Sequence, residues 1–555
     1  MQEHKSFDGY LEPLLISREP RLRPYLPMLA DFREWVLTDV DAQANYTDRY
    51  APPSLQTYDR NGEVVNRVVA NPWYDSQHQE IYRRGAVGLP YSEAAPHLLS
   101  FAMGFLLSQA DISLHCPVTL TGAVAYVLGY HASNEIRDKY LYDVTRMDGR
   151  TASGGTWATE KHGGSDVGAT TTTAVPRGEY FALHGLKWFT SNANSGLAVA
   201  TARPQGADAG VNGLGLYLVP SHLDDGSPNH YMIRRLKDKL GTKGLPTGEI
   251  ELLGAEAIEI AAPPHGIKLM MAALEYSRVH NAVGAAGVQC RALREAVQWA
   301  KSRTAFGHTL SEYPMVQDEL LRIRVRFEAG TLMAFEAARA FDASLADVKN
   351  STWLRLVTAL AKYLTAEDAI SATRATLELI GGNGYTSDYP IARIHRDAQV
   401  LTVWEGPANI QALELLRLLA PRYAGAAQYE RRVAGIINGL PAAMPQLGHA
   451  LQARLQDDLA AIASVMANEA SAQRYARKLL DRLSHSLAFA FMCETAAQAY
   501  SIGDDRRLLT AIRYHEELEQ PALGSEDERV RRAALHLLED EQVMETSHTS
   551  ASTSH

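Results

Sequence analysis

A short, ordered set of motifs between residues 381 and 411 constrains this chain more than any other part of its sequence. A glycine cluster, Gly381-Gly382-Asn383-Gly384-Tyr385, precedes a Val-Trp-Glu-Gly-Pro stretch that contains Glu405. Glycines let the backbone approach a bulky ligand closely, and Pro407 stops the chain and restarts a helix. We therefore expect Glu405 to be held on a rigid platform beside a large ligand.

The length, composition and charge of the chain limit the number of domains and the class of protein that we expect. At 555 residues the chain is too long for a single core, so we expect about two to four domains. A hydrophobic content of 46 % and a charged content of 21 % are typical of a soluble globular protein. The net charge of -10 argues against a surface that binds nucleic acid generally, although it leaves a local basic patch open.

The sequence indicates neither a targeting segment nor a metal site. Residues 1–14 lack the basic and apolar regions of a secretory signal, and no apolar stretch reaches the roughly 20 residues of a membrane span. Cys116, Cys290 and Cys493 lie far apart and outside any Cys-x-x-Cys pattern, which supports neither a disulfide framework nor a zinc site. We expect a cytoplasmic protein without a bound metal.

The pattern of apolar and polar residues changes along the chain, and these changes predict its domains. Apolar residues at helical spacing, such as Leu98, Ala102 and Leu106, dominate the first part, and short alternating strands follow. The pattern predicts an α+β, mostly α fold. Its expected parts are an N-terminal helical domain at 1–150, a central β domain at 151–265, a helical bundle with Glu405 at 266–420, a helical C-terminal extension at 427–541 and a disordered polar tail at 542–555.

Smaller signals predict individual elements inside these parts. The segment 52–72, which contains Asn61-Gly62, indicates loop and turn. Two helices are expected at 267–286 and 287–301. Strands are expected at 170–175, 180–184, 214–219 and 249–253.

Three motifs carry groups suited to a ring-shaped, phosphorylated ligand. In the segment 159–166, Thr-Glu-Lys-His-Gly-Gly-Ser-Asp, the glycines let the backbone curl around a ligand and the hydroxyls can bond to it. In 184–192, an aromatic side chain could cover a ring while Ser191 donates to it. Arg303 and Phe306 could meet a pyrophosphate and a base, although an arginine at a helix end can also serve only the helix dipole.

With these motifs in this order and at this spacing, residues 70–420 resemble the acyl-CoA dehydrogenase family of flavoproteins. The resemblance implies an N-terminal helical domain, a central small β-barrel domain and a C-terminal helical bundle. It also implies that FAD lies between the β domain and the second helical bundle, and that a partner subunit completes the FAD site.

The resemblance also assigns roles to residues. It makes Glu405 the catalytic base. It implies contacts of the chain with FAD from Thr156, Trp157, Ala158, Thr159, Gly164, Ser165, Phe189, Thr190, Ser191, Arg303, Phe306, Glu378, Gly381, Gly382, Pro407 and Asn409. It implies contacts with the acyl-CoA substrate from Ser165, Glu275, Arg278, Gly406 and Arg417.

The residues fit this chemistry independently of the resemblance. Removing a proton next to a thioester carbonyl needs a fixed base whose pKa is raised towards neutrality, and a carboxylate beside Trp404 in a dry pocket could supply it. The β-hydride needs an electron sink that no side chain provides, so a flavin is implied. A backbone N–H and a cofactor hydroxyl would meet the developing enolate charge.

Some positions depart from the family pattern. Glu378 stands where the family commonly has Gln, and Pro407 replaces a hydroxyl residue that usually touches FAD. Phe189 and Ser191 take positions where the family usually has Trp and Thr, and Pro314 takes a frequent Gln position. These departures concern single cofactor contacts and leave the expected base untouched.

A closer resemblance is to the AidB-type subgroup, which has a helical C-terminal extension and is associated with DNA binding and alkylation resistance. Segments 50–59, 115–121 and 236–241 carry this likeness. The extension could clamp duplex DNA if its arginines shared one face. Acidic runs interleave with them, however, which favours a salt-bridged surface. The basic residues are Arg431, Arg432, Arg474, Arg477, Lys478, Arg482, Arg506, Arg507, Arg513, Arg531 and Arg532.

These observations rank three functions. The first is an FAD-dependent acyl-CoA dehydrogenase that makes trans-2-enoyl-CoA, works as a homodimer or homotetramer and passes electrons to an electron-transfer flavoprotein. The second is an AidB-like flavoprotein that binds duplex DNA. The third is a flavin oxidase or monooxygenase, which retention of Glu405 argues against. The length and branching of the acyl chain stay open.

Overall fold

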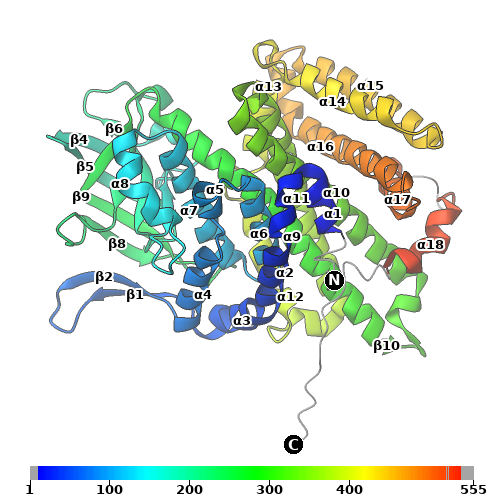
Figure 1. Cartoon of the computed structure of the whole chain (residues 1–555), viewed down its shortest axis with the longest axis horizontal. Coiled ribbons are helices and arrows are strands. Elements are labelled where there is room, and N and C mark those ends of the chain that lie inside the picture. The colour runs from blue at the N-terminus through cyan, green and yellow to red at the C-terminus, as the bar shows by residue number, and fades with distance from the viewer. Residues whose placement is uncertain (1–9, 521, 523, 539–555) are drawn as a thin grey trace, which may run out of the picture.

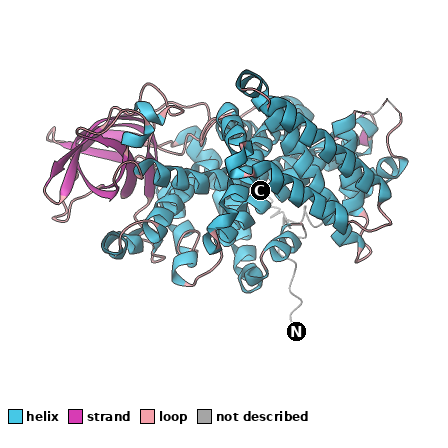
Figure 2. Cartoon of the chain, turned by 90° about the horizontal axis from the view of Figure 1, so that it is seen from above, coloured by secondary structure: helices cyan, strands magenta, loops and turns pink. Residues whose placement is uncertain are grey.

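The computed structural model describes residues 10–520, 522 and 524–538, so the expected tail at 542–555 lies outside the described residues. Helices make up most of the described chain, and a β domain lies at one end of the elongated molecule (Figure 2). The class is α+β and mostly α, as the sequence predicts.

The N-terminal part is helical up to Thr145, and the expected boundary near residue 150 falls between its last helix and the first strand of the β domain. Side chains cap some of the helix starts: Asn71 accepts from the backbone N–H of Tyr74, and Asp111 accepts from that of Ser113. The helices are α1 (Leu11–Arg18), α2 (Leu26–Trp35), α3 (Asp41–Tyr50), α4 (Pro72–Arg83), α5 (Leu89–Ser92), α6 (His97–Ser108), α7 (Ile112–Tyr130) and α8 (Asn134–Thr145).

Helix α7 corrects one expectation. An 18-residue window of this 19-residue helix has a mean hydropathy of 1.4, which makes the helix long and apolar enough to cross a membrane by length and composition. In the fold, 89 % of that apolar window is buried, and α7 packs against α6, α8 and α9. Its apolar surface is therefore covered by protein, as in a core helix.

The segment 52–72 also departs from the expectation of loop and turn. It forms an antiparallel hairpin of β1 (Ser54–Tyr58) and β2 (Val64–Val69), which extends from the helical part beside the β domain (Figure 1). The side chain of Asn66 accepts from the backbone N–H of Ile233 and donates to the backbone carbonyl of Tyr231. The hairpin is thus held by a strand distant in sequence.

The β domain is a closed barrel. The ring runs in the order β6, β4, β5, β9 and β7, and β7 pairs with β6 to close it. Outside the ring, β3 pairs with β6 and β8 pairs with β9. Trp157 and Tyr217 fill its core with aliphatic side chains. The strands are β3 (Gly154–Trp157), β4 (Thr173–Arg177), β5 (Tyr180–Ser191), β6 (Leu197–Pro204), β7 (Gly215–Pro220), β8 (Tyr231–Leu236) and β9 (Thr247–Ala261).

The second helical part contains the longest described helix and the segment with Glu405. Helix α9 runs unbroken where two helices were expected. A short hairpin of β10 (Thr304–Ala305) and β11 (His308–Thr309) follows it. The remaining elements are α9 (Gly266–Ser302), α10 (Pro314–Ala346), α11 (Ser351–Ile380), η7 (Gly381–Tyr385), α12 (Pro390–Ala398), η8 (Gln399–Thr402) and α13 (Ala408–Leu419).

The C-terminal extension packs on this bundle. Its long helix α16 lies against α10, α11 and α13, and its buried face is apolar (Figure 1). The extension is therefore part of one continuous core with the bundle. Its helices are α14 (Gly425–Gly439), α15 (Pro445–Met466), α16 (Glu469–Tyr500), α17 (Arg506–Glu519) and α18 (Glu528–Leu538).

Candidate active site

Glu405 lies in a strained turn between η8 and α13. Its φ is +57°, in the left-handed region that L-residues other than glycine rarely adopt, and the φ of Gly406 is +93°. Arg278 Nε and Gln411 Nε2 donate to the Glu405 carbonyl at 3.0 and 3.1 Å. Gln411 Nε2 and Lys362 Nζ both donate to the Gly406 carbonyl at 2.9 Å. Three side chains from α9, α11 and α13 thus hold two successive carbonyls.

The Glu405 carboxyl lacks such support at one of its oxygens. Glu405 is half-buried as a residue, but its Oε2 atom is buried and has no hydrogen-bond partner among the described residues. Burial raises the pKa of Glu405 to about 7, against the opposing positive charges of Arg278 and Lys362. A carboxylate with this pKa can take up a proton at neutral pH, which is the property expected of a general base.

The surroundings of Glu405 are apolar. The Trp404 ring packs against Cys116, Leu120 and Leu245, which form a small apolar cluster between α7 and the loop before β9. Trp404 Nε1 is also buried without a hydrogen-bond partner among the described residues. An unpartnered donor and an unpartnered acceptor on adjacent residues indicate a place for a polar ligand group.

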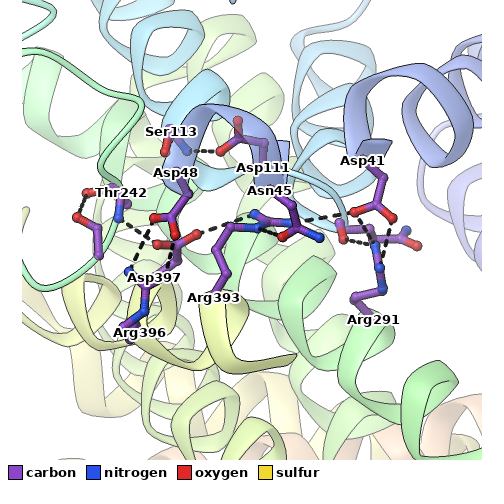
Figure 3. A network of polar contacts seen from close by, with 12 residues as sticks. Asp41, Asn45, Asp48, Asp111, Ser113, Thr242, Arg291, Arg393, Arg396 and Asp397 are labelled. Atoms are coloured by element: carbon purple, nitrogen blue, oxygen red, sulfur yellow. Dashed lines mark hydrogen bonds and ion pairs between the residues drawn. The ribbon is translucent and has the colours of Figure 1, made fainter. Parts of the chain in front are cut away.

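A buried polar network fixes α12, the helix that leads into this segment (Figure 3). Asp397 accepts from the backbone N–H of Thr242 at 2.5 Å and pairs with Arg393 at 3.5 Å. Arg393 also pairs with Asp41 on α3, which Arg291 on α9 approaches to 2.9 Å. The network joins the N-terminal helices, the loop before β9 and the bundle, so the segment around Glu405 is anchored from all three.

The predicted cofactor residues of the β domain divide into two groups. The side chains of Trp157 and Thr190 are buried in the barrel, and Thr190 Oγ1 donates to the Gly248 carbonyl, so contacts from these positions would use their backbone. The others leave part or all of their surface open: Thr156, Ala158, Thr159 and Ser191 are half-buried, and Gly164, Ser165 and Phe189 are exposed.

A buried ion pair fixes the start of the glycine-containing segment 159–166. Lys187 Nζ lies 3.0 Å from Glu160 Oε1 and donates to the Thr201 carbonyl at 2.8 Å. The remaining carboxylate bonds of Glu160 come from the backbone and hydroxyl groups of Thr171 and Thr172. Glu160 is the first residue after Thr159, so the pair fixes the start of the glycine turn on the barrel.

The predicted cofactor residues of the second helical part lie on the surface of the single chain. Phe306 is 98 % exposed at the tip of the β10–β11 hairpin, with a φ of +52°. Glu378 is exposed and pairs with Arg374 at 2.8 Å. The other exposed members are Arg303, Gly381, Gly382, Pro407 and Asn409.

The predicted substrate residues do not share one environment. Arg278 is buried, and its guanidinium pairs with Glu275 at 3.3 Å while it holds the Glu405 carbonyl. Arg417 is exposed, 3.9 Å from Glu414. The structure therefore gives Arg278 a place beneath the Glu405 turn and leaves Arg417 open to a ligand.

Two residues of the site were not among the candidates. Lys362 and Gln411 both bind the Gly406 carbonyl. The sequence carries a signal for Lys362, which stands alone in the apolar run Leu-Val-Thr-Ala-Leu-Ala-Lys-Tyr-Leu of α11. A lysine on a buried helix face needs a partner, and that partner is a carbonyl. No comparable signal marks Gln411.

Three family models match adjoining parts of the chain. Residues 30–148 match the adaptive response protein AidB N-terminal domain, 155–254 the acyl-CoA dehydrogenase middle domain, and 264–419 the acyl-CoA dehydrogenase C-terminal domain. The chain belongs to the acyl-CoA dehydrogenase family.

Relatives of this acyl-CoA dehydrogenase cover most of its length. Acyl-CoA dehydrogenase family member 11 of Caenorhabditis elegans is 31 % identical over 433 residues, which cover 74 % of this chain and 70 % of the relative. Putative acyl-CoA dehydrogenase AidB of Escherichia coli is 31 % identical over 382 residues, with 66 % and 69 % covered. The solved C. elegans ACDH-11 in complex with C11-CoA superposes with a TM-score of 0.86 at 25 % identity, covering 93 % of each chain.

The residues present fit FAD, the cofactor of this flavoprotein family. Gly163, Gly381 and Gly382 face open space, since an added Cβ would meet nothing within 4 Å at any of them. Phe189 offers an exposed ring on β5 for the flat face of a ligand. Trp404 and Glu405 also keep unpartnered polar atoms, Nε1 and Oε2, among the described residues. These features suit a large, flat and polar-edged group.

Proposed function

We propose that the chain is an FAD-dependent acyl-CoA dehydrogenase in which Glu405 removes the α-proton of an acyl-CoA thioester, giving trans-2-enoyl-CoA. One observation carries the proposal: the Oε2 atom of the half-buried Glu405 is buried and unpartnered among the described residues, and burial raises the pKa of this carboxyl to about 7. The apolar cluster of Cys116, Leu120 and Leu245 packs against the neighbouring Trp404, and an apolar environment of this kind favours a carboxyl whose pKa lies near neutral pH.

The residues around Glu405 would divide the work of the reaction. The Glu405 carboxylate takes the α-proton, and the three donors on the Glu405 and Gly406 carbonyls keep it in one position. When bound, FAD supplies the acceptor for the β-hydride that leaves with its electron pair. The pKa of Glu405 near 7 means that the proton can be released again at neutral pH.

The substrate is proposed to be an acyl-CoA that enters with its thioester beside Glu405 and Gly406. Arg417 offers an exposed guanidinium for the CoA portion. Arg278 and Glu275 would shape the entrance from below rather than reach the nucleotide. Because the C. elegans relative was solved with C11-CoA, acyl chains around that length are the first to test.

Two partners follow from the proposal. The exposed Arg303 and Phe306, with the open Gly381 and Gly382, fit a role in completing the FAD site of a second subunit in a homodimer or homotetramer. The reduced cofactor would pass its electrons to an electron-transfer flavoprotein. Chromatography with light scattering and an electron-transfer assay with that acceptor test these two points.

The test of the main proposal is anaerobic titration of the purified yellow protein with acyl-CoAs of increasing length. We expect the flavin absorbance to bleach with some of them. Replacing Glu405→Gln keeps the side-chain shape but removes the base, so that bleaching should fall by a factor of 1,000 or more while FAD stays bound (about 4 kcal/mol of lost barrier reduction). Undiminished bleaching by the variant would overturn the assignment of Glu405.

A further inference from the structure

Lys362 is a buried cation that the predicted site does not include. It lies on α11 with 1 % of its surface exposed, among Leu360, Ala361 and Leu364. Its ammonium group donates to the Gly406 carbonyl at 2.9 Å. Burying a lysine costs free energy unless it is hydrogen-bonded, so its place beneath the Glu405 turn calls for an explanation.

We propose that Lys362 is a positioning residue for proton abstraction, holding the left-handed Glu405–Gly406 turn and setting the protonation of the Glu405 carboxyl through its charge. The inference rests on the proposed function of Glu405 as the base. Lys362 itself touches the Gly406 backbone, and its effect on the substrate would pass through Glu405.

The geometry supports the positioning half of the proposal. A non-glycine residue at a φ of +57° costs about 1 to 3 kcal/mol and persists only where its surroundings impose it. Gln411 reaches both carbonyls of the turn from the following helix, whereas Arg278 and Lys362 reach one carbonyl each from α9 and α11. Lys362 therefore ties the turn to α11, which neither Arg278 nor Gln411 does.

The charges around the turn support the electrostatic half. Arg278 from α9 and Lys362 from α11 both favour the ionised form of Glu405, against burial. Cys116 from α7 also faces Glu405, and burial raises the pKa of its thiol to about 12, so it stays neutral. Burial lowers the pKa of Lys362 to about 8; the positive charge of Arg278 adds to that fall, while Glu405 and Glu367 oppose it. Lys362 is thus still cationic at neutral pH.

The test compares three variants by infrared titration of the carboxyl stretch, with the Glu405 band identified as the one lost in Glu405→Gln. Lys362→Met replaces the apolar part of the side chain and removes the charged amino group, and Gln411 still donates to the Gly406 carbonyl. We expect the midpoint of the Glu405 band to move up by about one pH unit in Lys362→Met and to stay near the wild-type value in Lys362→Arg. Lys349→Met, an exposed lysine replaced in the same way, should leave it unchanged.

A second readout concerns the reaction. In Lys362→Met, the bleaching rate at saturating acyl-CoA and neutral pH should fall by about fivefold and recover as the pH rises by two units, because more Glu405 is protonated at neutral pH. Equal midpoints in wild type and Lys362→Met, or a shift that Lys362→Arg shares, would overturn the proposal.

The outcomes also separate the two proposals. The infrared midpoint needs no substrate, so a protein that never bleaches with acyl-CoA would refute the proposed function whatever the midpoint does. If Lys362→Met fails to fold, Lys362→Arg decides: a wild-type midpoint and bleaching rate in a folded Arg variant support the charge-dependent role, and a midpoint raised as far as loss of the charge predicts refutes it.

Discussion

Glu405 combines a strained backbone with a carboxyl whose Oε2 atom is buried and unpartnered among the described residues. Both features lower the free energy of unfolding. Such conflicts concentrate at functional sites because chemistry needs groups that stability would remove. The donors Arg278, Lys362 and Gln411 offset the backbone strain but leave Oε2 alone. The effect of the carboxyl on the free energy of unfolding should therefore be measurable.

The stability cost of Glu405 should depend on pH. Its pKa is 4.5 when unperturbed and about 7 in the fold, so the folded state favours the protonated form. The resulting penalty is absent below pH 4.5, grows as the pH rises and levels off above about 7. We expect Glu405→Gln to gain on the order of 3 kcal/mol in free energy of unfolding relative to wild type between about pH 5 and pH 8.

Urea denaturation of both proteins at the two pH values measures this difference. Titration of other groups cancels between wild type and variant, so the comparison isolates residue 405. A constant difference between the two proteins across this range would mean that the carboxyl has an ordinary pKa.

The sequence predicts a functional role for Glu405 beside Trp404, but it does not predict that Lys362 and Gln411 support this turn. Lys362 and Gln411 bind backbone carbonyls, and those carbonyls converge only because Glu405 and Gly406 take positive φ values. The resemblance implies that Arg278 contacts the acyl-CoA substrate, and the structure adds that its Nε donates to the Glu405 carbonyl. Side chains that serve the backbone leave little pattern in the residue sequence.

At the scale of elements, the start of the glycine turn depends on one buried ion pair, Lys187–Glu160. Both side chains are sealed, at 0 % and 3 % exposed. Replacing Lys187→Met would leave the Glu160 carboxylate buried without its cation. Breaking a buried pair in this way costs about 3 to 5 kcal/mol, and we expect a loss of that size in free energy of unfolding.

Two comparisons test the cause of that loss. Adding Glu160→Gln to Lys187→Met should recover much of the stability, because the uncompensated charge is gone. Lys139→Met breaks a pair with Asp224 whose side chains are 48 % and 83 % exposed, and should cost less than about 1 kcal/mol. A Lys187→Met protein as stable as Lys139→Met in urea would contradict the prediction.

Elements were predicted best where the signal is local and less well where tertiary contacts decide. Gly287 was read as the boundary between two helices, but α9 continues through it. A Cβ at this position would lie 2.2 Å from the Phe105 carbonyl oxygen, so the close packing requires a glycine. That glycine serves close helix packing. The hairpin at 54–69 was read as loop because its docking depends on Asn66 and the distant β8.

For the whole molecule, the extension bears on the alternative of DNA binding. Many of its arginines are already engaged: Arg432 with Glu494, Arg482 with Asp458, Arg506 with Asp504, Arg507 with Glu328 and Arg513 with Asp318. Several of these pairs join the extension to the bundle or to itself. This use of arginines supports the ranking of DNA binding below dehydrogenation.

These ion pairs predict weak DNA binding whose affinity depends little on the salt concentration. With few free cations on the extension, affinity for duplex DNA should change by less than about tenfold between roughly 50 and 200 mM salt. A protein that makes six to ten phosphate contacts would lose about 1,000-fold or more over the same range. Fluorescence anisotropy with a labelled duplex distinguishes these outcomes, and a steep salt dependence would restore the DNA-binding alternative.

Helix α1 links the beginning of the described chain to its last third. Tyr10 donates to the Glu328 carbonyl, 318 residues away, and lies beneath Arg507 of α17. Arg18 approaches Glu336 on α10 and Glu494 on α16. A ribosome makes α1 before α10, α16 and α17, so this helix must wait for those later helices to provide the surfaces that bury it. Nascent chains should therefore depend on chaperones until the extension emerges.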